Sequence, residues 1–390
     1  MSRIVVCGYM VRHPVAGNLL AYLHYVLGLA RLGHEVVYLE ESGWPRSCYD
    51  PFGGTHTDDP SVGLRIVRAL LASHGLDARV YYVDRDTRIV RGGHRRDVES
   101  ALRKADLLLN VGGVCWLPEF TLCPRLALVD LDPLFTQLGY FGAEGLDQHH
   151  VLFTYGANIG SDGCTVPTAG RDWSPTVPPV VPDIWPRAEA LDGPFTTVAN
   201  WRAYGGVIHR GRHYGQKDEE FLRLLNLPSR TPQRLELALS GAGAQVRQQL
   251  RAGGWSVRDA GELDGDMTAY RAYIRRSRGE LSAAKHAYVV TRSGWFSDRS
   301  VCYLAAGRPV VVQDTGIDAW LPTGRGVQVF DTAEQAADCI AEVNADYMRH
   351  RRAATELTRD VFGFDVVLPR LLEAAVAEPS RTVLPLGRAR

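Results

Sequence analysis

The spacing of apolar and polar positions changes repeatedly along the first half of the chain. The apolar run in Arg3–Gly8 predicts a buried strand, and apolar residues at helical spacing over Gly17–Leu32 predict a helix that ends at Gly33. Glu35–Leu39 predicts a second strand. The alternation continues through helices at Ser61–His74 and Asp97–Lys104 and strands at Arg79–Val83, Leu107–Val111, Arg125–Val129 and Val151–Tyr155. Strands separated by helices indicate parallel βαβ units, and therefore a doubly wound α/β domain over residues 1–175.

Prolines interrupt the pattern between Pro167 and Pro194. Because proline lacks a backbone N–H and restricts φ, we expect irregular structure there and place an interdomain linker at 176–194.

Alternation then resumes, which predicts a second Rossmann-like domain over 195–360. The predicted strands are Thr196–Asn200, Leu235–Leu239, Val289–Thr291, Pro309–Gln313 and Val327–Phe330. The predicted helices are Asp218–Asn226, Ala244–Ala252, Met267–Ser277 and Ser297–Ala306, followed by an almost wholly helical stretch over Thr332–Ala377. Residues 361–390 are expected to form a last helix and a tail able to pack back on the first domain.

The composition is that of an ordinary globular protein, with 390 residues, 45% hydrophobic residues and a formal net charge of zero. Charge balance gives no reason to expect nucleic acid as a partner. The chain has no apolar run long enough to cross a membrane, and its first residues are too few for a signal peptide. The seven cysteines form no C-x-x-C pair, so we expect reduced thiols and a cytoplasmic location. A homodimer is left open.

The segment with the clearest chemistry is a small loop that opens a helix. Ser293, Gly294, Trp295 and Phe296 precede Ser297, a natural N-cap. Free backbone N–H groups and the positive end of the helix dipole bind phosphate at such a position. The next strand ends in the polar turn Asp314-Thr315-Gly316, at the edge of the sheet where α/β proteins bind ligands. The alternative is a loop–helix–strand unit with a purely structural cap.

This second half resembles the donor-binding region of GT-B glycosyltransferases. Gly307-Arg308-Pro309-Val310-Val311 followed by Asp314 has the order of their G-x-P-V-V strand and sugar-contacting acid. Leu32-Gly33-His34-Glu35-Val36 is similar to their entry into the second strand. The segments Gly279–Lys285 and Val129–Pro133 resemble a group of bacterial GT-B-like proteins. The resemblance implies two Rossmann-like domains facing across a cleft, with the acceptor on the first domain and the nucleotide sugar on the second.

The chain departs from this family in ways that concern the stereochemistry. The two glutamates seven residues apart that mark retaining members are absent, since their positions fall near Gly294 and Cys302. Gly294-Trp295-Phe296-Ser297 is similar to the start of another donor motif, but its histidine is missing. Inversion and retention therefore both stay open.

The resemblance also implies a base in the loop after the first strand, where inverting members hold a histidine. His13 is the histidine of this loop, and a neutral imidazole suits proton transfer from an acceptor. Packing of the loop is the alternative for His13. Gly17 and Asn18, at a helix N-terminus, are predicted to approach the diphosphate. Asp132 is predicted to orient His13 or the acceptor, with a structural strand-end role as its alternative.

Cationic side chains are expected to neutralise the leaving diphosphate. The candidates are Lys217, Lys285 and Arg202, against the alternative of solvated surface groups. Asp130-Leu131-Asp132 imitates a metal-binding D-x-D motif, but it ends a buried strand, so we expect no metal and no cofactor. Aromatic residues that could stack on an acceptor are Trp116, Tyr140, Phe141, Phe153 and Tyr155, with core packing as their alternative.

These observations favour a metal-independent hexosyltransferase that moves a sugar from a nucleoside diphosphate to a small acceptor, such as a specialised metabolite. An epimerase or hydrolase of the same fold and an inactive nucleotide-sugar-binding protein remain as alternatives. A Rossmann-type oxidoreductase is disfavoured because no G-x-G-x-x-G follows the first strand of either domain.

Overall fold

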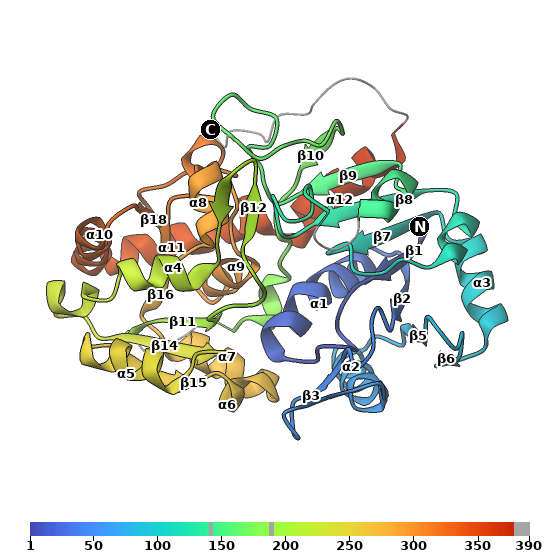
Figure 1. Cartoon of the computed structure of the whole chain (residues 1–390), viewed down its shortest axis with the longest axis horizontal. Helices are drawn as coiled ribbons and strands as arrows, with labels where there is room; N and C mark the ends of the chain where they lie inside the picture. The colour runs from blue at the N-terminus through green and yellow to red at the C-terminus, as the bar shows by residue number, and fades with distance from the viewer. Residues whose placement is uncertain (140–142, 187–190, 378–390) are drawn as a thin grey trace. The chain divides into compact units, whose positions relative to one another are not determined.

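The chain forms two units, each built around its own sheet of mainly parallel strands (Figure 1). The computed structural model describes residues 1–139, 143–186 and 191–377. Unit 1 comprises Met1–Gly156, Pro167–Val181 and residues 363–377, and unit 2 comprises Ala157–Val166 and the rest of the described chain from Pro182 to Phe362. The helix at the end of the described chain therefore belongs to the same unit as its beginning.

The sheet of unit 1 is a Rossmann-type sheet with strand order β10-β9-β8-β7-β1-β2-β5-β6. All neighbouring strands are parallel except β5 and β6. The strands are β1 (Arg3–Cys7), β2 (Glu35–Glu41), β5 (Arg79–Val83), β6 (Val90–Arg91), β7 (Leu107–Val111), β8 (Leu126–Asp130), β9 (Val151–Thr154) and β10 (Trp173–Pro175). The order reverses between β1 and β7, which makes their carboxyl ends the expected ligand-binding edge.

The described part of unit 1 contains four α-helices and a small hairpin. They are α1 (Ala16–Arg31), α2 (Ser61–Ser73), α3 (Arg95–Lys104) and α12 (Phe364–Val376), and the hairpin is β3 (Cys48–Asp50) with β4 (Thr55–Thr57). Leu102 of α3 joins Val5, Val37 and Leu108 in one apolar cluster, so α3 covers that face of the sheet. Helix α12 packs on α1, where a Cβ on Gly28 would lie 2.7 Å from Leu368 Cδ1.

Unit 2 repeats the arrangement with strand order β15-β14-β11-β16-β17-β18, in which every pair is parallel. The strands are β11 (Phe195–Asn200), β14 (Leu235–Ser240), β15 (Ser256–Asp259), β16 (Gly279–Ser282), β17 (Val310–Gln313) and β18 (Val327–Phe330). This order reverses between β11 and β16. The doubly wound α/β architecture predicted from the alternating pattern is therefore confirmed.

Helices cover both faces of the second sheet. They are α4 (Lys217–Arg223), α5 (Ala244–Ala252), α6 (Gly261–Asp264), α7 (Met267–Arg276), α8 (His286–Thr291), α9 (Asp298–Ala305), α10 (Ala333–Ala345) and α11 (Tyr347–Leu357), and a hairpin joins β12 (Val207–His209) to β13 (Arg212–Tyr214). On one face, Phe195 and Leu237 pack with Ile340 of α10. On the other, the hydroxyls of Thr196 and Tyr303 of α9 lie 2.6 Å apart.

Two local predictions were wrong. Val289–Thr291 belongs to helix α8 and not to a strand, because the sheet position beside β11 and β17 is taken by β16. A three-residue apolar run cannot by itself distinguish strand from helix. The proline-rich stretch also holds a short strand, β10, which pairs with β9 although it ends in Pro175. Such a proline is tolerated because β10 lies at the edge of the sheet.

Candidate functional site

The predicted donor loop lines a hollow in unit 2 at the N-terminus of α9. The hollow encloses about 240 Å³, space open to solvent included, and lies where β16 and β17 end. Its lining residues are Ser282, Ala284, Trp295, Phe296, Ser297, Ser300, Val312, Gln313 and Thr315. This edge of the sheet, next to the reversal of strand order, is where open α/β sheets bind ligands.

The first turn of α9 supplies polar groups to this hollow. Ser297 caps the helix, since its Oγ accepts the N–H of Arg299 at 3.2 Å. Ser300 Oγ is buried and has no hydrogen-bond partner among the described residues. A buried hydroxyl without a partner is unfavourable, and a ligand oxygen in the hollow would satisfy it. Together with the positive end of the helix dipole, this hydroxyl makes the turn suitable for a phosphate group.

A buried ion pair holds this turn to the sheet. Arg299 Nε lies 2.6 Å from Glu280 Oε1, and Arg299 also donates to Ser282 Oγ and to the carbonyl of Val198. The carboxylate of Glu280 is fully buried. Sequence reasoning did not single out Arg299. One signal was present, because a cation in the first turn of a helix opposes the dipole and therefore indicates a partner elsewhere.

Two of the three lysines lie close to the same turn. The Lys217 ammonium is 5.9 Å from the ring centroid of Trp295, and within the described parts of the chain no hydrogen bond or ion pair engages it. Burial, and then the positive charges of Arg299 and Lys285, lower the pKa of Lys217 to about 7. Lys285 is buried and donates to the Tyr204 hydroxyl at 2.6 Å. An anion in this region would relieve the repulsion among these cations.

The low pKa of Lys217 predicts a pH-dependent affinity for diphosphates. Below pH 7 the side chain is an ammonium, whereas above pH 7 it is neutral in the free protein and must regain its proton to attract the ligand. We therefore expect the Kd for UDP to rise by up to about tenfold per pH unit above pH 7. Calorimetric titrations from pH about 6 to 9 measure this slope.

The chain offers a matched control for this titration. Lys217→Met should flatten the slope above pH 7, whereas Lys104→Met, which replaces the exposed lysine of α3, should keep it. An unchanged slope in Lys217→Met would assign the pH dependence to another group.

Asn158 fixes the shape of the donor loop, and sequence reasoning missed it. Its side-chain amide donates to the carbonyls of Arg292 and Gly316, at 3.1 and 2.8 Å, and its backbone N–H donates to Ser293 O. Gly294 has a φ of +75°, and a Cβ there would lie 2.7 Å from Asn158 Cγ. Glycine is therefore required at 294 both by backbone conformation and by this close approach.

The predicted sugar-contacting turn is strongly tied to its surroundings. One Asp314 oxygen accepts the N–H of Gly316 at 2.6 Å, and the other lies 2.9 Å from Arg292 Nη1. Thr315 Oγ1 donates to Trp295 O, which joins the turn to the donor loop. These contacts give Asp314, Thr315 and Gly316 structural roles. Their contact with a donor sugar stays a prediction.

The other residues predicted to bind the donor differ in their exposure to solvent. Ser293 is fully buried and Phe296 stacks on Phe362 at 5.2 Å, so both support the loop from within. Trp295 is half-buried and packs on Tyr288 at 4.7 Å. Arg202, predicted to face the diphosphate, forms an ion pair with Asp218, and its part in donor binding stays a prediction.

In unit 1, the predicted base lies in the loop after β1. Burial, and then the charge of His56, lower the pKa of His13 to about 4. The imidazole is therefore neutral at pH 7 and able to accept a proton. Asn18 holds this loop, because its side-chain amide donates to the carbonyls of Tyr9 and His13, at 2.7 Å each. Gly17 and Asn18 both lie in the first turn of α1, and their approach to a diphosphate stays a prediction.

The two aspartates after β8 differ in their surroundings. Asp130 is fully buried and its oxygens accept from Thr136, Gln137 and Thr154 at 2.6 to 2.8 Å. It therefore organises the loop after β8. Asp132 donates its backbone N–H to Asp130 Oδ1. A role for Asp132 in orienting His13 or an acceptor stays a prediction.

The aromatic candidates of the first domain are mostly packing residues. Phe153 and Tyr155 are buried, and the Tyr155 hydroxyl lies 2.8 Å from that of Tyr25. Trp116 makes an edge contact with His149 at 5.7 Å. Tyr140 and Phe141 lie outside the described residues.

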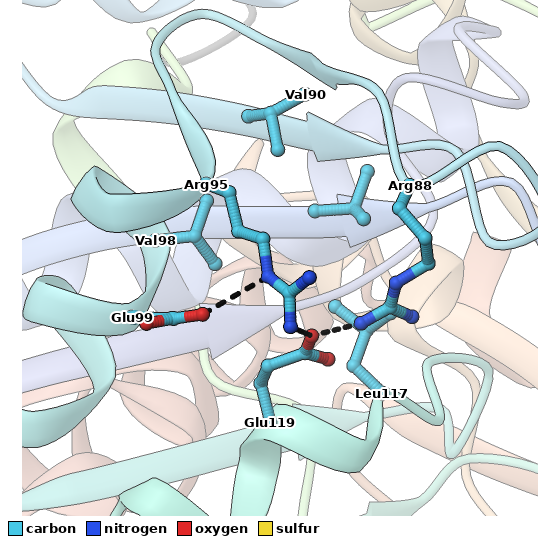
Figure 2. Close-up of a pocket in the computed structure, with 8 residues that line it drawn as sticks. Arg88, Val90, Arg95, Val98, Glu99, Leu117 and Glu119 are labelled. Carbon is cyan, nitrogen blue, oxygen red and sulfur yellow. Dashed lines mark hydrogen bonds and ion pairs between the residues drawn. The ribbon is translucent and has the colours of Figure 1, made fainter.

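A second hollow lies in unit 1, and the charged residues that line it form ion pairs with one another. Figure 2 shows Arg88 and Arg95 both directed at the carboxylate of Glu119, with Arg95 also paired to Glu99 at 3.0 Å. Its other lining residues are the apolar Val83, Val90, Val98 and Leu117. Because the charged groups neutralise one another, we assign no ligand to this hollow.

Three further findings bear on the sequence analysis. No disulfide joins the seven cysteines, five of which are buried. No helix in the described ranges is long and apolar enough to cross a membrane. Among those same residues, no three His, Cys, Asp or Glu side chains are grouped so as to hold a metal ion.

The chain is similar to known proteins in its three-dimensional structure. No protein-family model and no curated protein sequence matches the chain. AviGT4, a glycosyltransferase involved in avilamycin A biosynthesis, is similar with a TM-score of 0.54 and 15% identity, over 96% of this chain and 97% of that one. HepE of Anabaena, in complex with UDP-glucose, gives a TM-score of 0.59 and 12% identity over 96% and 99%.

An alpha-glucosyltransferase in complex with UDP gives a TM-score of 0.58 and 9% identity, over 97% of this chain and all of that chain. At such low identity the likeness concerns the fold, and it extends over nearly the whole chain in each case. Two Rossmann-type sheets followed by C-terminal helices agree with it. The chain therefore has the GT-B fold of glycosyltransferases.

Proposed function

We propose that the chain transfers a sugar from a nucleoside diphosphate to a small acceptor, and that the hollow at α9 binds the donor diphosphate. The observation that carries this proposal is the first turn of α9. There the helix N-terminus and the Ser300 hydroxyl, which has no hydrogen-bond partner among the described residues, line one hollow. Trp295 lines that hollow, and the ammonium of Lys217, 5.9 Å from the centroid of the Trp295 ring, supplies positive charge beside it. Hydroxyl, backbone N–H and ammonium groups together are what a diphosphate requires.

The same groups suit the chemical step. As the bond between the anomeric carbon and the diphosphate breaks, its electron pair goes to the phosphate oxygen, so the leaving group gains negative charge. The helix dipole and the ammonium of Lys217 would stabilise this charge more in the transition state than in the ground state, which accelerates transfer. Because protein cations are available for this task, we propose transfer that does not depend on a divalent metal.

The similar structures suggest which nucleotide to use first as a probe. HepE is described in complex with UDP and glucose, and the alpha-glucosyltransferase in complex with UDP. We therefore propose UDP as the first diphosphate to test, with a hexose as the transferred sugar. On the acceptor side we propose His13 as the base, since its imidazole is neutral and lies in the loop after β1.

Two alternatives share the donor site and differ in the fate of the bound donor. A hydrolase or epimerase would consume UDP-glucose without an acceptor, and an inactive binding protein would bind it without turnover. Product analysis with and without an acceptor distinguishes the three.

Removing the Ser300 hydroxyl tests the donor site directly. Because Ser300 Oγ has no described partner, Ser300→Ala should leave the Tm unchanged or slightly raised. If the hydroxyl binds a phosphate oxygen, the same variant should raise the Kd for UDP about 10- to 100-fold, the effect of losing one hydrogen bond to a charged group. Thermal melts and calorimetric titration measure the two quantities.

Ser277→Ala is a control for Ser300→Ala, because it should change stability and not UDP affinity. The Ser277 hydroxyl is buried, donates to Tyr273 O at 2.8 Å and lies 2.6 Å from the Thr196 hydroxyl. Ser277→Ala should therefore lower the Tm and leave UDP affinity unchanged. A wild-type protein that binds none of UDP, TDP, GDP and ADP would overturn the proposal, as would UDP affinity that Ser300→Ala does not alter.

A further inference from the structure

Five aromatic rings form a continuous series in unit 1, at the edge of the sheet where β1 and β2 end. We name this series the ring ladder; its members, in spatial order, are Trp44, Tyr9, His13, Tyr49 and His56. Successive ring centroids are 6.1, 5.7, 5.3 and 5.1 Å apart. The rings come from the loop after β1, the segment after β2 and the β3–β4 hairpin. The ladder therefore lies near the reversal of strand order, where ligands of such sheets bind.

A buried guanidinium supports one end of the ladder. Arg12 is fully buried, and its Cζ lies 4.6 Å from the ring centroid of Tyr9 and 5.0 Å from that of Trp44. Arg12 is fixed by Glu40, whose Oε1 accepts from its backbone N–H at 2.7 Å and pairs with its Nε at 3.3 Å. A Cβ on Gly43 would lie 2.1 Å from Arg12 Nη1, so glycine lets the chain pass over the guanidinium. Both rings are thus held in place before any ligand arrives.

Trp44 is nevertheless one of the exposed large hydrophobic residues in the described part of the chain. It is 53% exposed, although Arg12 lies against its ring. A rigid, solvent-exposed tryptophan loses little conformational entropy on binding and offers a large apolar surface. The guanidinium of Arg12 also attracts the electrons of the Trp44 ring, so the ring face is less negative than that of a free tryptophan. A second electron-rich planar ring therefore suits Trp44 better than the electropositive C–H groups of a sugar.

We propose that the ring ladder binds a planar aromatic acceptor that carries a phenolic hydroxyl, and that this hydroxyl is presented to His13. The inference rests on the proposed function and specifies its acceptor. In the transfer step the phenol oxygen forms a bond to the anomeric carbon while the bond from that carbon to the diphosphate breaks. The phenolic proton passes to the imidazole of His13, and the electron pair of the broken bond leaves with the diphosphate.

The basicity of His13 supports a phenol independently of the stacking geometry. A histidine whose pKa is lowered to about 4 is a weak base. Phenols, with pKa values near 10 as for tyrosine, lose their proton far more readily than aliphatic sugar hydroxyls. A weak base is therefore sufficient for a phenol and poorly matched to a sugar acceptor.

Acceptor binding can be measured without turnover. Umbelliferone, a planar phenol, and methyl glucoside serve as probes, each titrated with and without saturating UDP. We expect umbelliferone to bind the wild type, Trp44→Ala to weaken it about tenfold, and Trp44→Phe to retain most of the affinity. All three proteins should bind UDP equally.

Phe52 supplies a matched control on the β3–β4 hairpin. It is 73% exposed and takes part in no ring contact among the described residues, so Phe52→Ala should not change umbelliferone affinity. Umbelliferone that does not bind, or binds equally to wild type and Trp44→Ala, overturns the inference, and so does Trp44-dependent binding of methyl glucoside. Failure of UDP to bind would count against the proposed function alone, because the umbelliferone titration without UDP still tests the ladder.

Discussion

His13→Ala is expected to reduce turnover by about 10² to 10⁴ while the Kd for UDP stays close to that of the wild type. The base accepts the acceptor's proton as the new glycosidic bond forms, so its loss affects the transition state and not donor binding. The low basicity of His13, with a pKa of about 4, favours the lower half of this range.

The pH profile provides a second measurement of the same role. His13 must be neutral to act, and it is neutral at every pH above its pKa of about 4. For the free enzyme, kcat/KM should therefore not fall between pH about 7 and 5 through this group, and should decline only as the pH approaches 4. A fall in kcat/KM as the pH drops through about 6.5 would indicate that the base is another histidine, with an unperturbed pKa.

His56 offers a control for this variant. Its ring belongs to the ring ladder but is not assigned as the base, so His56→Ala should leave kcat far closer to that of the wild type than His13→Ala does. Its other expected effects are on acceptor KM and on the pKa of His13, which the charge of His56 lowers. Near-wild-type kcat in His13→Ala would remove His13 from the mechanism. Retention of anomeric configuration in the product would contradict its assignment as the base of a direct displacement.

Arg299→Met is expected to lower the free energy of unfolding by about 3 to 5 kcal/mol. The substitution leaves the Glu280 carboxylate fully buried without its counter-charge, and Glu280 Oε2 already has no hydrogen-bond partner among the described residues. It also removes the bonds that join the first turn of α9 to Ser282 Oγ and to Val198 O. UDP affinity should therefore fall in the same variant. Denaturant unfolding and calorimetry measure the two effects.

Two controls separate this effect from the loss of any arginine. Arg258→Met breaks the more exposed pair with Glu262 on the same unit, and should cost no more than about 1 kcal/mol. The double variant Arg299→Met, Glu280→Met removes both charges and should recover part of the stability, because no unpaired ion is left buried. An Arg299→Met protein as stable as Arg258→Met would show that the pair is not needed for folding.

Local pattern alone predicted most of the regular structure. Apolar periodicity and stop signals such as Gly33 are local features of the sequence. They were sufficient to predict the strand at Arg3–Cys7, the helix after it and the strand at Val310–Gln313. The predicted N-cap at Ser297 was confirmed for the same reason, since a cap depends on residues two or three positions away. Strand alternation with helices was sufficient for the doubly wound class.

Tertiary structure decided which residues the hollow and the ladder contain. Arg299 and Glu280 are 19 positions apart, Trp44 and Arg12 are brought together from separate loops, and Asn158 reaches Gly316 across 158 positions. Such pairings depend on which strands become neighbours, and no local window records that. The same holds for Ser300, whose hydroxyl is ordinary in sequence and distinctive only because folding buries it with no partner in the described part of the chain. The sequence by itself determined most of the elements and the edge of each sheet at which open α/β sheets bind ligands. The chemistry at that edge arose from long-range packing, which sets burial, charge pairing and the pKa values of Lys217 and His13.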